Sequence, residues 1–203
     1  ISEKNPYQKL LKEAVESGSD KTFKVLKWPG NKWFPYIKLF FKKAYIIHHF
    51  WPHDFYKGRN LLSALLKQIS FQLPLPFLIN RKLIYSVENL VCHEFTDFNF
   101  EVKMIQKLIN KSDGLIFMTN ASKDLFLNHY KTPPNCKILI LPHISYTDQY
   151  KNTLSTKESR DLLNLKENDR VILSLGRVDK YKGIIELIHS FSLSAGKNDV
   201  LLI

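Results

Sequence analysis

Short apolar runs alternate with stretches of helical periodicity along most of the chain, and few folds accommodate that order. The apolar runs lie at residues 23–26, 44–48, 82–87, 114–119, 137–141, 171–175 and 199–203. Helical periodicity is found over residues 5–17, 61–70, 98–110, 122–129 and 184–194. Buried-type strands that alternate with helices are typical of a parallel sheet. We therefore predict an α/β fold with Rossmann-like parallel sheets.

A polar stretch between residues 146 and 170 interrupts this pattern. It contains no strand-like run and has room for one short helix. A strand, a helix and the start of another strand follow it, which is the opening βαβ unit of a second domain. We predict an N-terminal domain over residues 1–150, a linker over 151–168 and the first, truncated part of a second domain over 169–203.

Polar residues gather just after the predicted strands. The carboxyl ends of parallel strands meet at one edge of a sheet, where ligands bind. The residues concerned are His48, His49 and Trp51, then Glu88, Asn89, His93 and Glu94, then His143 and Tyr146, and in the second domain Gly176, Arg177, Lys182 and Gly183. Their shared position predicts a ligand site at these edges. Since successive strand residues face opposite ways, at most one of His48 and His49 can face such a site.

The turn that follows residues 171–175 has the composition of a phosphate site. Gly176 and Gly183 let a ligand approach the backbone closely. Arg177 offers a planar fork to phosphate oxygens, and Lys182 offers a point charge. The amino end of the next predicted helix adds a partial positive charge. The alternative is that the two cations are simply solvated on a turn.

The segment GRVDKYKG, followed by IIELIHSF, resembles the start of the donor-binding domain in GT-B glycosyltransferases of the large group-1 type, family 4. In that family the Arg and the Lys hold the diphosphate of a nucleotide-sugar, which implies that role for Arg177 and Lys182. Three more segments agree in chain order, NPYQKLLKEAVESG, YSVENLVCHE and LPHISYTDQY. The resemblance implies a GT-B fold, further donor contacts from Gly176, Gly183 and His143, and acceptor-side contacts from Asn5, Tyr7, His49, Trp51, Asn89, Glu94 and Tyr146.

The chain departs from the family's pattern at three positions in these segments. Glu88 stands where many relatives have His, Cys92 where Pro is common and Ile144 where Gly is common. Glu88 or His93 could act as a general base toward an acceptor hydroxyl, or orient it. The alternative is that His93 caps or braces the loop and that Glu94 lies in the first turn of the next helix, where its charge is favoured. For His143 the alternatives are contact with the sugar or phosphate and a role as a hinge residue.

The resemblance implies transfer of a sugar from a nucleotide-sugar donor to a glycan or lipid-linked acceptor, in polysaccharide, lipopolysaccharide or capsule assembly. Arg177 and Lys182 would neutralise the leaving diphosphate, so we expect no cofactor and no required metal. A basic α/β nucleic-acid-binding module and a non-catalytic nucleotide-sugar-binding scaffold are the alternatives. We expect no nucleic-acid partner, because the cations are spread out and no nucleic-acid-binding signature is present.

The net charge of +11 favours an anionic partner. Residues 27–43 interleave aromatic side chains with lysines, a composition that suits the surface of an anionic membrane. A core helix with a lysine face is the alternative. No apolar run approaches the roughly 20 residues of a membrane span, and we see no signal peptide. Together with two cysteines that we expect to be reduced, this predicts a cytoplasmic protein, located at the inner face of the membrane if residues 27–43 bind there.

Overall fold

The structure is a computed structural model that describes residues 6–18, 24–25, 36, 46–57, 61–72, 81–91, 97–151 and 153–203. The chain divides into two compact units, Ile1–Ser145 and Tyr146–Ile203. Both units contain parallel strands and helices, so the predicted α/β class with parallel sheets is confirmed. The division falls between Ser145 and Tyr146, a few residues before the predicted linker.

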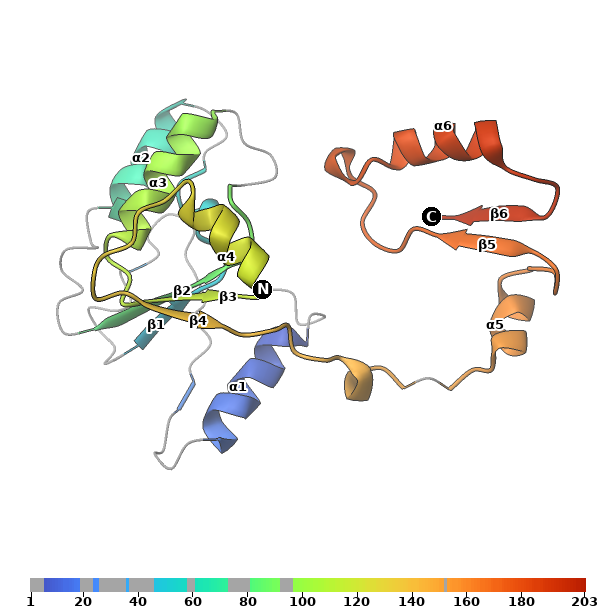
Figure 1. Cartoon of the computed structure of the whole chain (residues 1–203), viewed down its shortest axis with the longest axis horizontal. Coiled ribbons are helices and arrows are strands. Elements are labelled where there is room, and N and C mark those ends of the chain that lie inside the picture. Colours follow the sequence, from blue (N-terminus) through green and yellow to red (C-terminus); the bar gives the residue numbers. More distant parts are fainter. Residues whose placement is uncertain are drawn as a thin grey trace. The chain divides into compact units, whose positions relative to one another are not determined.

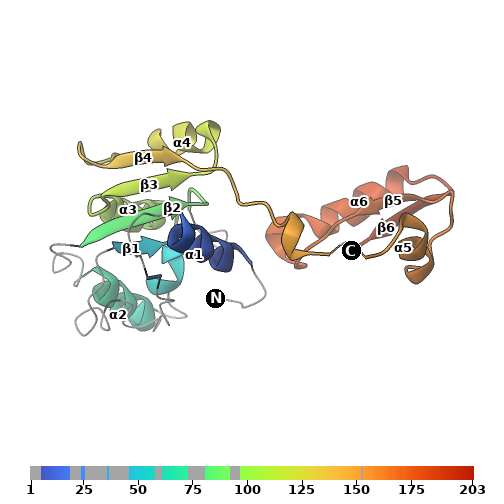
Figure 2. The ribbon, with the colours of Figure 1, turned by 90° about the horizontal axis from the view of Figure 1, so that it is seen from below.

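The first unit is built on a four-stranded parallel sheet. Its strands are β1 (Ile46–His49), β2 (Lys82–Val87), β3 (Gly114–Phe117) and β4 (Lys137–Ile140), in the spatial order β1-β2-β3-β4. Helices α2 (Leu61–Gln72), α3 (Phe98–Ile109) and α4 (Asn120–Leu127) connect successive strands. These three helices lie on one side of the sheet, and α1 (Tyr7–Ser17) lies on the other (Figure 1; Figure 2).

Local signals explain where two of these helices begin. The carboxylate of Asp97 accepts a hydrogen bond from the backbone N–H of Phe100 and caps α3. Thr119 and Ser122 form a reciprocal capping box at the start of α4. Both caps are set by residue type and spacing. The sequence analysis predicted both helices without using these caps.

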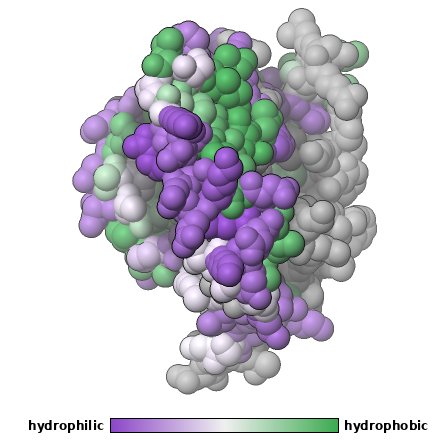
Figure 3. Space-filling view, turned by 90° about the vertical axis from the view of Figure 1, so that its right-hand side faces the viewer, coloured by the Kyte–Doolittle hydropathy of each residue, from purple (hydrophilic) through white to green (hydrophobic). Residues whose placement is uncertain are grey.

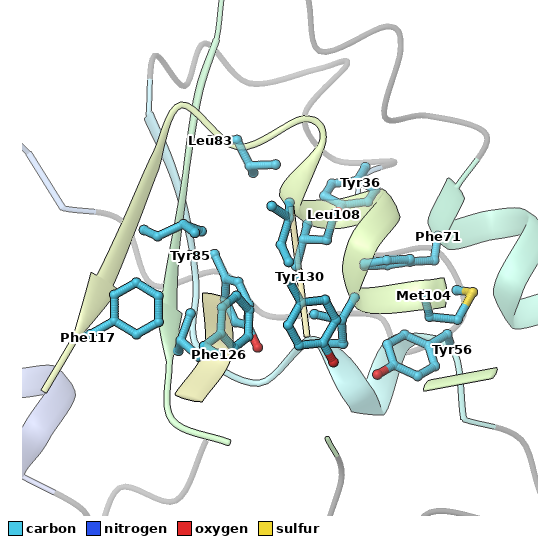
Figure 4. Close-up of a cluster of buried hydrophobic side chains, with 14 residues drawn as sticks. Tyr36, Tyr56, Phe71, Leu83, Tyr85, Met104, Leu108, Phe117, Phe126 and Tyr130 are labelled. Carbon is cyan, nitrogen blue, oxygen red and sulfur yellow. The ribbon is translucent and has the colours of Figure 1, made fainter. Parts of the chain in front are cut away.

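The core of the first unit lies between the sheet and the helices α2, α3 and α4. Alternate residues of β2, namely Leu83, Tyr85 and Val87, are buried there, as are Leu115 and Phe117 of β3. The helices contribute residues that include Phe71, Met104, Ile105, Leu108, Ile109 and Phe126. Figure 4 shows that aromatic rings from several elements make up much of this cluster.

The second unit contains a smaller parallel sheet. β5 (Arg170–Leu173) pairs with β6 (Asp199–Leu202), and α6 (Ile184–Ser194) connects them. The short helix α5 (Thr156–Leu162) precedes β5 and begins at a capping box formed by Ser155 and Glu158. Large apolar side chains are exposed on this unit, including Leu175 at 90% and Ile185 at 77%. Figure 3 shows hydrophobic residues, in green, exposed among hydrophilic residues, in purple.

Three predictions fall wholly or mainly on residues outside the described part of the chain. The strand expected at residues 23–26 is covered only by Lys24 and Val25, which are not in a strand. Of the aromatic and lysine-rich residues 27–43, only Tyr36 is described, and it is buried. Cys92 also lies outside the described residues, whereas Cys136 is a free thiol. Of the helices that the structure describes, none has the length and apolar character needed to cross a membrane.

Candidate functional site

Several strands of the first unit end at one edge of its sheet, and polar and aromatic residues follow them there. Phe50 follows β1, Glu88 follows β2, and His143 lies three residues beyond the end of β4. The strands are parallel, so their carboxyl ends lie at the same edge. This is the edge at which open parallel sheets bind ligands.

Tyr7, in the first turn of α1, connects the ends of β1 and β4. Its ring centroid lies 5.6 Å from that of Phe50, edge to face, and 4.9 Å from that of the His143 ring. Tyr7 is 8% exposed, whereas His143 is exposed. The sequence predicted separate roles for Tyr7 and His143, on the acceptor and donor sides. The structure brings the two rings into contact.

Glu88 supplies a carboxyl group to this edge. Its side chain is half-buried. Burial raises the pKa of the Glu88 carboxyl group above its ordinary value, and the nearby His143 opposes that shift. A general base works best when its pKa lies near the working pH, so the shift brings Glu88 closer to that range. The environment of Glu88 therefore suits a proton acceptor.

The contact made by His143 indicates which ring nitrogen carries its proton. Nδ1 of His143 lies 2.9 Å from the carbonyl oxygen of Ile144. Because a carbonyl oxygen can only accept, Nδ1 is the donor in this hydrogen bond. In the neutral imidazole, Nε2 is then an acceptor.

His48 and His49 lie on the two faces of β1, as their adjacency requires. His49 is 7% exposed and faces the core, with its Nε2 3.0 Å from the hydroxyl oxygen of Tyr36. Nε2 of His48 lies 2.8 Å from Oγ of Ser86, and its ring centroid lies 4.1 Å from that of Phe50. The sequence selected His49 for the acceptor side. In the structure, the ring of His48 packs against Phe50 at the sheet edge, whereas His49 faces the core.

Burial also sets the charge of these two histidines. It lowers the pKa of His48 to about 4. It lowers the pKa of His49 to about 4 as well, with a smaller contribution from His48. Both rings are therefore neutral near pH 7 and act there as hydrogen-bonding groups rather than cations.

The predicted phosphate turn of the second unit lies beyond the carboxyl end of β5. Gly176 has a φ of 140° and Gly183 a φ of 66°, backbone conformations that favour glycine. Gly183 directly precedes the first residue of α6. Arg177 and Lys182 are both exposed, and Nζ of Lys182 lies 5.2 Å from the centroid of the Tyr181 ring. The turn thus presents both cations beside two glycines that permit close approach.

Asp179 is a member of this turn that sequence reasoning did not identify. Its carboxylate forms an ion pair with the guanidinium of Arg177 and accepts a hydrogen bond from the backbone N–H of Lys180. The side chain of Arg177 is 80% exposed and that of Asp179 is 20% exposed. An anion that binds Arg177 must therefore compete with a carboxylate that is already in place.

Three predicted site residues, Asn5, His93 and Glu94, lie outside the described part of the chain. Glu88 and His93 were alternative candidates for the general base. Only the surroundings of Glu88 are described, so the prediction for His93 stays as it was.

The structure also describes three further predicted residues, Trp51, Asn89 and Tyr146. Trp51 is 48% exposed, and its ring centroid lies 6.3 Å from that of His53. Asn89 is half-buried and directly follows Glu88. Tyr146 belongs to the second unit, and its ring centroid lies 6.4 Å from that of Tyr150.

A buried polar network near Trp51 was also missed. The hydroxyl group of Tyr56 donates to Oε2 of Glu101 over 2.7 Å and lies 2.7 Å from Nδ1 of His53. Glu101 is 2% exposed and shares its face of α3 with Met104 and other buried residues. Glu101 is followed at i+3 and i+4 by apolar residues, which places it on the apolar face of its helix. This position was the sequence signal from which the buried network could have been predicted.

The described residues contain no group of three or more His, Cys, Asp or Glu side chains that could hold a metal ion. Comparison with known families and with curated proteins adds no assignment, because no family model and no curated sequence matches the chain significantly.

Proposed function

We propose that the protein is a glycosyltransferase of the GT-B type that moves a sugar from a nucleotide-sugar to a hydroxyl of a glycan or lipid-linked acceptor. The observation that carries this proposal is the turn after β5, where exposed Arg177 and Lys182 stand beside Gly176 and Gly183. Its sequence, GRVDKYKG, is also the most specific part of the resemblance to group-1 glycosyltransferases.

The donor's diphosphate would bind at this turn. A guanidinium and an ammonium group can together neutralise much of its charge, and the amino end of α6 adds a partial positive charge. The leaving group of a nucleotide-sugar is a nucleoside diphosphate whose negative charge grows as the glycosidic bond breaks. Fixed cations at that position stabilise the transition state, and such electrostatic stabilisation is commonly the largest catalytic contribution.

The acceptor hydroxyl would bind at the sheet edge of the first unit. The exposed ring of His143, supported by Tyr7, is available for a sugar to pack against, and Glu88 provides a carboxylate. Proton transfer from the hydroxyl to a positioned base contributes typically 10²- to 10⁴-fold to such reactions. Glu88 is our candidate for that base.

A thermal-shift screen of nucleotide-sugars tests the donor assignment. The expected result is a rise in Tm with at least one nucleotide-sugar that is lost in Arg177→Ala and in Lys182→Ala. Arg170→Ala is a matched control, because it also removes an exposed arginine paired with an aspartate, Asp199, but at the opposite end of β5. Equal shifts in Arg177→Ala and Arg170→Ala would contradict the assignment.

Product formation with a donor that gives such a shift tests the reaction itself. Transfer to a sugar or lipid-linked acceptor is the expected outcome. Donor binding that depends on Arg177, without transfer or hydrolysis across an acceptor panel, would instead identify a nucleotide-sugar-binding scaffold.

A further inference from the structure

His48 lies on the face of β1 that turns away from the core, and the proposed function gives it no role. Its neighbour His49 faces the core, so His48 faces the opposite side of the sheet. Nε2 of His48 lies 2.8 Å from Oγ of Ser86, a residue of the adjacent strand β2 that is 3% exposed. This hydrogen bond to a buried hydroxyl group holds the imidazole in one orientation.

Four rings form a continuous row from His48 to the edge of the sheet, which we call the ring row. The His48 ring is tilted by 33° against that of Phe50, with the centroids 4.1 Å apart. The Phe50 ring meets Tyr7 edge to face at 5.6 Å, and Tyr7 meets His143 at 4.9 Å. Rings at such separations prefer particular mutual orientations. The ring row therefore connects β1, α1 and the segment after β4 through side chains.

Tyr7 joins the buried and the exposed parts of the ring row. It is the only buried residue of α1, whereas His143 is exposed. The hydrogen bond from Nδ1 of His143 goes to Ile144, the next residue in the chain. The contact with Tyr7 instead ties the His143 ring to the packed part of the domain. Closely packed side chains transmit a displacement, because little free volume is left to absorb it. A change at His48 should therefore reach His143.

Two properties of His48 favour a positioning role over a role in proton transfer. Its Nε2 is engaged with the hydroxyl group of Ser86. Burial also lowers its pKa to about 4, and a group with so low a pKa is a weak proton acceptor near neutral pH. His48 is therefore poorly suited to take the proton of an acceptor hydroxyl, a task for which Glu88 is our candidate.

We propose that His48 is a positioning residue of the candidate site. Held by Ser86, it fixes the ring row, and the ring row sets the orientation of the exposed His143 ring. This orientation matters because His143 is the ring against which a sugar would pack. The effect of His48 on the position of His143 follows from these contacts, whereas its effect on sugar transfer rests on the proposed function.

Aromatic carbon–proton NMR spectra of the whole chain test the positional effect. The Cε1–H signal of His143, assigned with His143→Gln, senses the ring current of Tyr7 because the two rings are in contact. Tyr7→Leu gives the position of this signal without the contact. His48→Gln can still hydrogen-bond to Ser86 but has no ring to pack against Phe50, so the signal should move toward its position in Tyr7→Leu. A signal that does not move in His48→Gln would overturn the proposal.

Two further variants show whether the ring contact causes the displacement. His48→Phe keeps a ring against Phe50 and should leave the His143 signal close to its wild-type position. His129→Gln is a matched control, because it removes another histidine whose ring contacts a phenylalanine, Phe98, just beyond the end of α4. It should leave the signal in place. An equal displacement in His48→Gln and in either of these variants would indicate a general effect on folding and would overturn the proposal.

Steady-state kinetics test the consequence for sugar transfer. His48→Gln should lower kcat/KM for the acceptor by about 10- to 100-fold, because a small misplacement of a positioning group is costly. The KM for the nucleotide-sugar should not change, since the turn after β5 belongs to the other unit. An unchanged kcat/KM for the acceptor would contradict the positioning role. If the wild type transfers no sugar, the proposed function is wrong, and the NMR result still decides whether His48 positions His143.

Discussion

The hydroxyl group of Tyr56 donates a hydrogen bond to the carboxylate of Glu101 across 2.7 Å, inside the first unit. Its proton is committed to Glu101, so its oxygen accepts from Nδ1 of His53, 2.7 Å away. Burial tends to raise the pKa of Glu101, but the hydrogen bonds from His53 and Tyr56 and nearby positive charge outweigh it, and the pKa is lowered. The network therefore holds a buried carboxylate in its charged form, between α3 and the segment that follows β1.

The first prediction concerns Glu101→Gln. Because the pKa of Glu101 is lower in the folded state, the unfolded state takes up the proton first as the pH falls. The stabilisation is present above the ordinary value of 4.5 and is lost below it. Glu101→Gln should be about 1–3 kcal/mol less stable near pH 7 and should lose this acid dependence. Urea denaturation over a pH series measures both effects.

An exposed glutamate provides the control for that prediction. Glu13 is paired with Lys9 at 3.9 Å, and its side chain is 55% exposed. Glu13→Gln should change the free energy of unfolding by less than about 0.5 kcal/mol. If Glu101→Gln behaves in the same way, the buried network does not contribute to stability.

The second prediction uses the depressed pKa of His49. Burial lowers this pKa from 6.5 to about 4, so the unfolded chain binds a proton between these values while the folded chain does not. Stability should therefore fall as the pH drops from 6.5 to 4, by about 3 kcal/mol for this residue. His49→Gln can still hydrogen-bond Tyr36 but cannot titrate. Its unfolding free energy should depend less on pH in this window, and an unchanged slope would contradict the burial argument.

The elements of the fold were largely predictable because their signals are local. β2 (Lys82–Val87) and α6 (Ile184–Ser194) have the bounds that periodicity predicted. α3 begins at a cap that Asp97 supplies from its own sequence neighbourhood. The short 3-10 helix at Pro52–Phe55 was not predicted, because a single turn leaves no periodicity to detect.

The candidate site was only partly predictable. The sequence indicated which residues follow the strands, since that depends on chain order alone. It could not indicate that Tyr7 contacts His143, because the two are far apart in the chain and meet only through the packing of α1 against the sheet edge. Likewise, alternation on β1 indicated that His48 and His49 face opposite ways, but only the position of the core decides which one faces it.

The third prediction tests the interaction of Glu88 with His143 and rests on the proposed transferase activity. Burial raises the pKa of Glu88, and His143 lowers it. If Glu88 is the base, kcat/KM should fall on the acidic side with an apparent pKa above 4.5, the ordinary value. His143→Gln should move this acidic limb to higher pH, because the opposing influence is gone. Glu88→Gln should reduce kcat by about 10²- to 10⁴-fold. If the acidic limb of the pH profile stays at the same pH in His143→Gln, His143 does not lower the pKa of Glu88 as we expect.

The fourth prediction concerns the ion pair between Arg177 and Asp179. The carboxylate of Asp179 competes with an incoming phosphate for the guanidinium, so Asp179→Asn should bind inorganic pyrophosphate about two- to fivefold more tightly than the wild type. Asparagine can still accept the hydrogen bond from the backbone N–H of Lys180, so the turn should keep its shape. Isothermal titration calorimetry measures the two affinities directly.

The control for Asp179 lies at the other end of β5. Asp169 accepts a hydrogen bond from the backbone N–H of Lys166 and directly precedes the strand, so Asp169→Asn makes the same charge change away from the turn. We expect it to leave pyrophosphate affinity unchanged. An equal gain in both variants would reflect net charge alone. A weaker affinity in Asp179→Asn would mean that the carboxylate orients Arg177 for the anion instead of competing with it.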